Sequence, residues 1–167
     1  MIERVLRVTS LLAVLALVAA AAARADAGGN GTVTITVHGH NEVYFSESVI
    51  NPCTGAPGTV TAVATNDVFH VTFFTAPGAD EFWVTGTGEG TASFTPDDPT
   101  GVSASGHFVS WFGESSNNQN DVQHDTNTIQ LIGTDGSRTT VHMFDHLTVN
   151  ANGVVTVSFS NFRFTCG

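Results

Sequence analysis

The chain contains no lysine and few other basic residues. Its 167 residues include 15 acidic side chains and only 5 basic ones, all of them arginine. Nucleic acids and anionic lipid surfaces are bound by clustered lysine and arginine side chains, which neutralise phosphates. The composition therefore predicts that neither a nucleic acid nor an anionic membrane surface is a partner.

Long hydrophobic runs are also missing, except at the N-terminus. Arg4 and Arg7 precede an apolar run of about 16 residues, which is short for a membrane span, and Ala23-Arg24-Ala25 follows it. This pattern predicts a cleaved signal peptide over residues 1–25, a lead over 26–31 and one domain over 32–167 of a secreted protein. No membrane anchor is expected after cleavage; a retained anchor helix is the alternative. The mature chain would keep 14 acidic and two basic residues, a net charge of −12.

Cysteine is scarce, with only Cys53 and Cys166 present. In a secreted protein two cysteines favour a disulfide, and this one would close a loop of more than 100 residues. The chain-entropy model gives such a loop roughly 4–5 kcal/mol of stabilisation. Free thiols, one of them a nucleophile, are the alternative, but no histidine lies within several residues of either cysteine.

Helical periodicity is absent after residue 25, whereas alternation of apolar and polar residues is frequent. Asp135-Gly136 and Asn152-Gly153 are typical of hairpin turns, because these dipeptides adopt positive φ. The pattern predicts an all-β domain of about 8–10 strands, arranged as a single antiparallel β-barrel or, alternatively, a β-sandwich. The expected strands are 32–38, 40–49, 59–65, 67–75, 81–87, 89–95, 104–112, 126–133, 137–149 and 153–165.

Two segments break the alternation. In the last expected strand the apolar side changes parity near Ser160-Asn161, which predicts a β-bulge there. The polar segment 113–125 has no periodicity, which predicts an exposed loop that is either a plain connection or an interaction surface.

Histidine is frequent, with seven residues. His38, His40 and Glu42 occupy alternate positions, so a continuous strand would point them to one side as ligands for Zn²⁺ or another divalent metal. A hydrophilic outer face explains the same spacing, because Thr32, Thr34 and Thr36 share it. Oxygen-rich residues within 117–125 suggest calcium, without the EF-hand spacing. No other cofactor is expected.

His142, Asp145 and His146 are candidates for lining a ligand pocket. Asp145 lies on the apolar parity of its strand, where a carboxylate must be paired, protonated or near water. An interior Asp145 of raised pKa would suit a barrel cyclase or isomerase. No serine-hydrolase elbow, metalloprotease helix, phosphate loop or dinucleotide motif is present.

Asn51-Pro52-Cys53-Thr54-Gly55 and the segment 146–166, which ends in Cys166, resemble a group of small secreted proteins of actinobacterial type. The resemblance implies secretion, the disulfide and an all-β fold, and it carries no assigned activity or catalytic residues. Taken together, the sequence predicts a non-enzymatic extracellular barrel that binds a small apolar ligand or serves as a surface module. A metal-dependent protein and a protein-binding module are the alternatives, with a small ligand or an extracellular protein as partner.

Overall fold

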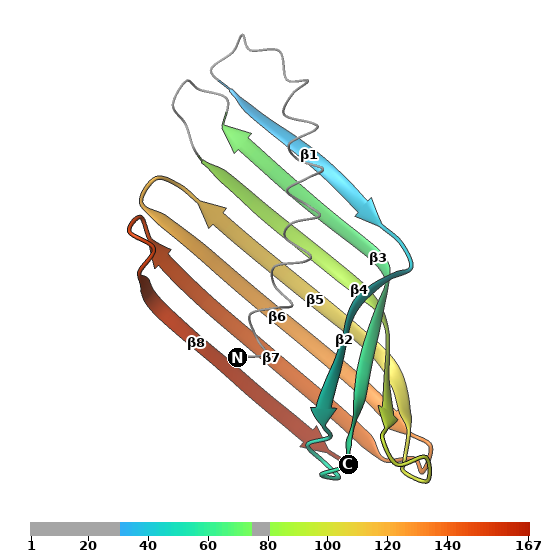
Figure 1. The fold of residues 1–167 in the computed structure, drawn as a ribbon. Coiled ribbons are helices and arrows are strands. Elements are labelled where there is room, and N and C mark those ends of the chain that lie inside the picture. Colours follow the sequence, from blue (N-terminus) through green and yellow to red (C-terminus); the bar gives the residue numbers. More distant parts are fainter. Residues whose placement is uncertain (1–30, 75–80) are drawn as a thin grey trace.

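The computed structural model describes residues 31–74 and 81–167, which form one antiparallel sheet (Figure 1). The signal peptide expected at 1–25 and all of the lead except Gly31 lie outside the described residues. Within the described part no helix is long and apolar enough to cross a membrane. The strands are β1 (Thr32–Gly39), β2 (Glu42–Ile50), β3 (Pro57–Phe74), β4 (Phe82–Pro96), β5 (Ala104–Ser116), β6 (Asn120–Gly133), β7 (Arg138–Asn150) and β8 (Val155–Cys166).

Strand β3 is long enough to pair with two partners on one side. Its first half pairs with β2 and its second half with β1, while β4 runs along its other side (Figure 1). The chain bends between β1 and β2 at Asn41, whose φ of 56° lies in the left-handed region that asparagine tolerates. From β3 onward each strand pairs with the next, which leaves β8 at the far edge.

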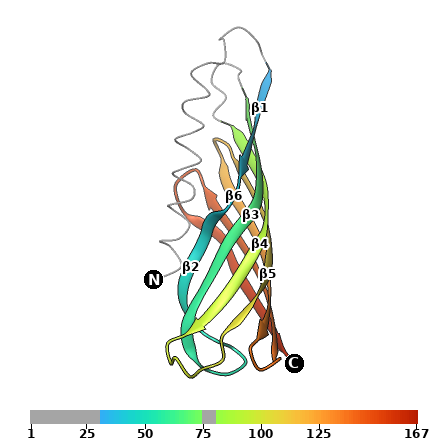
Figure 2. The same ribbon diagram turned by 90° about the vertical axis from the view of Figure 1, so that its right-hand side faces the viewer.

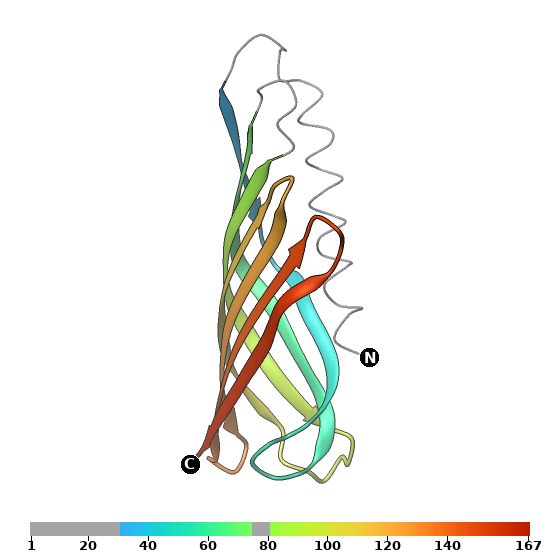
Figure 3. The same cartoon turned by 90° about the vertical axis from the view of Figure 1, so that its left-hand side faces the viewer.

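The sheet is strongly curved but not closed, so the all-β antiparallel prediction is confirmed while closure into a barrel is absent. Among the described residues, no ladder joins β8 to β1 or β2. Views at right angles show β2 bending over the concave side while β8 stays apart from it (Figures 2 and 3). The alternative of a β-sandwich is not met either, because the eight strands form a single sheet.

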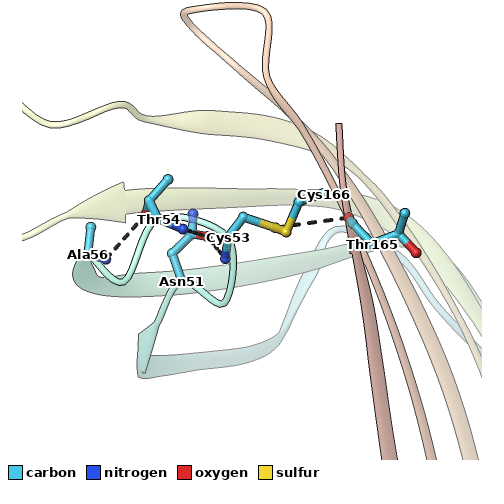
Figure 4. The surroundings of a disulfide bond; sticks show 6 residues. All are labelled: Asn51, Cys53, Thr54, Ala56, Thr165 and Cys166. Atoms are coloured by element: carbon cyan, nitrogen blue, oxygen red, sulfur yellow. Dashed lines mark hydrogen bonds between the residues drawn. A yellow bond between two sulfur atoms is a disulfide. The ribbon is translucent and has the colours of Figure 1, made fainter.

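A disulfide joins the two edges of the sheet at one end. Cys53, in the turn between β2 and β3, is bonded to Cys166 at the end of β8, as predicted, with the Cα atoms 5.6 Å apart (Figure 4). The Asn51 side chain holds this turn, because its Oδ1 accepts hydrogen bonds from the backbone N–H groups of Cys53 and Thr54 at 2.9 and 3.3 Å. Gly55 completes the turn at a φ of 74°.

The main hydrophobic core lies on the concave face, near the disulfide. Phe94 and Phe108 are its largest buried side chains, and Tyr44 from β2 stacks on Phe108 with ring centroids 5.3 Å apart. Curvature places β2 over this cluster, so the concave face is covered at this end. The buried members of the cluster are Ala62, Ala64, Ala92, Phe94, Phe108, Ile129, Leu131 and Val141.

Two pairs of expected strands are continuous in the structure. The segments 81–87 and 89–95 form one strand, β4, whose Gly86 and Gly88 give room to larger side chains of β3. A Cβ at Gly86 would lie 2.5 Å from the Phe69 ring, and one at Gly88 would lie 2.8 Å from a carboxylate oxygen of Asp67. The segments 59–65 and 67–75 likewise merge into β3, with a register shift between Ala64 and Asn66.

Two further sequence predictions are wrong. The segment 113–125 is not a long loop, because β5 extends to Ser116 and β6 begins at Asn120, leaving a short hairpin turn. The ladder between β7 and β8 passes Ser160-Asn161 without a register shift; its irregularity lies at Thr148/Val149 instead. The hairpin turns at Gly136 and Gly153 are confirmed, with φ of 85° and 74°.

Candidate functional site

The predicted metal ligands are not carried by one continuous strand. His38 is exposed on β1, which ends at Gly39, whereas Glu42 begins β2 after the bend at Asn41. His40 lies in this bend, with its Nδ1 3.3 Å from the backbone oxygen of Thr65. Residues 31–74 and 81–167 contain no group of three or more His, Cys, Asp or Glu side chains placed to hold a metal ion. The structure therefore does not bring the three predicted ligands together as one site.

The predicted pocket residues of β7 lie on opposite faces of the sheet. Asp145 shares the concave face with Val141, as its parity predicted, and is paired directly with Asp125 of β6. The two histidines lie on the convex face. His142 Nδ1 is 3.0 Å from the hydroxyl of Thr128. Because strand neighbours point to opposite sides, His142, Asp145 and His146 do not line one pocket.

A histidine pair on the convex face was missed in the sequence. His146 lies opposite His124 of β6, with their Nδ1 atoms 3.0 Å apart and ring centroids separated by 4.2 Å. Such a hydrogen bond requires one ring N–H to donate to the unprotonated nitrogen of the other ring. The Thr148 hydroxyl lies 3.1 Å from Nε2 of His146 and orients that ring. Only the register between β6 and β7 reveals this pair.

The concave face also carries buried polar side chains beyond the apolar core. Asp67, Ser110 and Glu114 are 4%, 7% and 6% exposed, and the Tyr44 hydroxyl lies 3.0 Å from the Ser110 hydroxyl. Burial raises the pKa of Tyr44, and it also raises the pKa values of Asp67 and Asp121. Each of these two carboxylates has a buried Oδ1 atom without a hydrogen-bond partner, so ionisation is costly there.

Glu114 is the most perturbed of these acids. Loss of water raises the pKa of Glu114 to about 7, and repulsion from Asp121 adds to the effect, while a hydrogen bond with Gln123 opposes it. Sequence reasoning placed Glu114 in a loop, whereas β5 carries it to the concave face. Glu114 can therefore hold a proton near neutral pH, which makes this face a source of pH-dependent stability.

Two hollows in the described part of the chain are both small. One of about 40 Å³ lies in the core between β2 and β7, lined by Val49, Phe94, Leu131 and neighbours. Another of about 120 Å³ lies on the convex face beside Trp111. Binding pockets for small molecules usually measure several hundred Å³. Both of these hollows are smaller than that.

Strand β8 is the most unusual surface. All twelve of its residues are exposed, including Phe159, Phe162 and Phe164 at about half of their full exposure. Edge strands are normally short, charged, bulged or interrupted by proline, which prevents pairing with other chains. The opposite edge is divided between β1 and β2: β1 has only eight residues, and β2 has nine, carries Glu42 and Glu47, and is bulged. Strand β8 contains no proline and no acidic residue.

No known protein family, curated protein or solved structure matches this chain. The arrangement of its own side chains and strands is therefore the basis for a functional assignment.

Proposed function

We propose that the protein is a secreted, non-enzymatic module that associates with a second copy of itself through the edge strand β8. The observation that carries this proposal is the exposure of all twelve residues of an edge strand that has no proline, a single charged side chain, Arg163, and an irregularity only near its start, at Thr156. The disulfide supports secretion, because such bonds persist in oxidising compartments. The N-terminal segment 1–25 has the composition of a signal peptide.

The backbone of β8 has hydrogen-bonding groups available for a partner strand. Arg138 and Gly167 exchange both backbone hydrogen bonds, at 2.6 and 2.9 Å, so residues at odd positions of β8 bond to β7. The residues at even positions consequently direct their N–H and C=O groups away from β7. They include Ser158, Ser160, Phe162 and Phe164.

A two-fold axis near Asn161 pairs these groups antiparallel between two copies. Phe162 then lies opposite Ser160 of the partner subunit, and about eight new backbone hydrogen bonds form. On the convex face Phe159 lies opposite Arg163 of the partner subunit. This pairing allows a cation–π contact between the arginine guanidinium and the phenylalanine ring. The absence of carboxylates on β8 lets two strongly acidic chains approach each other along this edge.

Closure of the sheet into a barrel is the alternative way in which strand β8 could form backbone hydrogen bonds. It would require β8 to pair with β2 within one chain. That pairing would protect the β8 amides from hydrogen exchange while leaving the protein monomeric.

Sedimentation velocity of the disulfide-bonded chain 26–167, over a series of micromolar concentrations, tests the proposal. We expect a concentration-dependent dimer. Ser160→Pro removes an outward N–H that makes no bond to β7, so it should abolish the dimer and leave the monomer folded. Asn161→Asp places like charges across the axis and should weaken association about tenfold.

The matched control is Thr126→Asp, which adds the same charge to the exposed side of the central strand β6 and should leave the dimer unchanged. A monomer at every concentration would refute self-association, and β8 amides protected in that monomer would favour closure of the barrel instead. A dimer that is equally stable in Ser160→Pro would exclude β8 as the interface.

A further inference from the structure

A second surface, on the convex face of β3, β4 and β5, has the features of a binding site. The hollow of about 120 Å³ described above lies here. Strands β3, β4 and β5 are neighbours in the sheet (Figure 1). It is lined by Val68, His70, Thr85, Gly86, Thr87 and Trp111. It is independent of β8, which lies three strands away from β5.

Trp111 forms one wall of this hollow and is held flat against the sheet. Its ring lies over Gly113, two residues further along β5 on the same face. A Cβ at Gly113 would lie 2.7 Å from Cη2 of the indole, so only glycine allows this close approach. The side chain remains 43% exposed. One face of a rigid indole is therefore presented to solvent.

The other walls supply neutral hydrogen-bonding groups. Thr85 and Thr87 are exposed on β4 and provide two hydroxyl groups. His70 Nδ1 lies 3.0 Å from the Thr36 hydroxyl, which orients the imidazole and leaves Nε2 for a further hydrogen bond. No Asp, Glu, Lys or Arg side chain lines the hollow. A charged ligand would find no counter-charge there.

We infer that this hollow, the Trp111 groove, binds a pyranose unit of a neutral oligosaccharide. A pyranose ring has an apolar face of C–H groups, which stacks on an exposed indole, and a rim of hydroxyls, which matches threonine hydroxyls and an imidazole. The hollow of about 120 Å³ is smaller than the cavity of about 150 Å³ that encloses benzene, so a single ring would lie over the indole at the surface and not be enclosed. A protein partner would need a far larger contact, of roughly 800 Å² per side.

A second exposed tryptophan extends the groove along the strands. Trp83, 47% exposed, lies on the same convex face and contacts Phe74 edge-on, with ring centroids 5.2 Å apart. It is paired with Ser115, four residues along β5 from Trp111, which corresponds to about 13 Å along the strand. A chain of sugars stacked on Trp111 would reach Trp83, so longer oligosaccharides should bind more tightly.

Isothermal titration calorimetry with a β-1,4-linked glucose hexamer, an α-1,4-linked glucose hexamer and free glucose tests this inference. We expect saturable binding of at least one hexamer, and weaker binding of glucose. Trp111→Ala should weaken hexamer binding at least tenfold. Gly113→Ala should weaken it as well, although Trp111 itself is retained, because the added methyl group displaces the indole.

Val109→Ala is the matched control, since Val109 is exposed on the same strand and face, two residues before Trp111, and does not line the groove. It should bind like the unmodified protein. Trp83→Ala should remove the advantage of the hexamer over glucose while preserving glucose binding. Failure of all three sugars to bind at millimolar concentration would overturn the inference, as would binding that is unchanged in Trp111→Ala.

Discussion

Replacement of Glu114 by glutamine should remove a large part of the pH dependence of stability. Glu114 is 6% exposed on the concave face, and its pKa is raised to about 7 by burial and by Asp121. In the unfolded chain a glutamate titrates near its ordinary value of about 4.3. The folded state therefore holds this proton more tightly than the unfolded state. The stability contributed by protonation is complete below about pH 4 and is lost as the pH rises to 7.

The magnitude follows from the size of the shift. One pKa unit corresponds to about 1.4 kcal/mol, so the ionised Glu114 side chain costs at most about 4 kcal/mol of folding free energy above pH 7. Glutamine keeps the shape of the side chain and a carbonyl oxygen that accepts a hydrogen bond from Gln123. We expect Glu114→Gln to be about 1–3 kcal/mol more stable than the unmodified protein at pH 8, and nearly equal to it at pH 4.

Urea denaturation of the disulfide-bonded protein at pH 4, 6 and 8 measures these differences. Glu89→Gln is the control, because Glu89 is an exposed glutamate on the neighbouring strand β4. It should leave the pH profile unchanged. A smaller pH dependence should remain in Glu114→Gln, because Asp67 and Asp121 also have raised pKa values. Equal loss of stability from pH 4 to 8 in Glu114→Gln and the unmodified protein would refute the reasoning.

Two further predictions concern the disulfide and the core. The double variant Cys53→Ser/Cys166→Ser should lose up to about 4–5 kcal/mol of unfolding free energy in urea titrations, because the bond closes a span of 113 residues; a loss below 1 kcal/mol would contradict this. Phe94→Ala should cost about 3–5 kcal/mol, because Phe94 is 2% exposed. Phe164→Ala, at a residue 49% exposed, should cost less than half as much in the monomer, and equal costs would contradict the assignment of the core.

The sequence allowed the strands near the C-terminus to be predicted well, because local signals determine them. Gly136 and Gly153 supply the positive φ that their hairpin turns require, and the structure has turns at both places. The cysteines allowed one pairing only, and that disulfide is present. These features depend on neighbouring residues or on simple counting, so no knowledge of the three-dimensional arrangement was needed.

The acidic part of the concave face could not be predicted from the sequence, because alternation of apolar and polar residues identifies a strand only when one side of it is apolar. Around Glu114, Asp121 and Asp125 the residues on the concave face are polar as well as those on the convex face. The sequence of these strands therefore resembles that of a loop. The His124–His146 pair depends on the register between two strands, which periodicity within one strand does not determine. On β8 both faces are exposed, so neither is selected to be apolar, and the change of parity there does not signal a bulge.

The open sheet also depends on properties beyond local patterning. Whether the edges of a curved sheet meet is decided by the twist accumulated over all its strands. Here β3 is long enough to serve both β1 and β2, so the first edge is divided into two short strands with a bend at Asn41. Neither short strand pairs with β8 in the described part of the chain. Counting strands predicted the class of fold but not the gap between its edges.

The disulfide has a mechanical consequence, because it makes strands β3 to β8 part of one covalent ring. A force applied between the N-terminal end of β1 and the C-terminus passes through the bond between Cys53 and Cys166, one residue before the chain ends. Pulling can then separate β1 and β2 from β3. The 113-residue span between the two cysteines cannot extend, because the disulfide holds its ends together. Reduction would release about 400 Å of additional extension. For a protein under load in an oxidising environment, most of the sheet would be shielded from the pulling force.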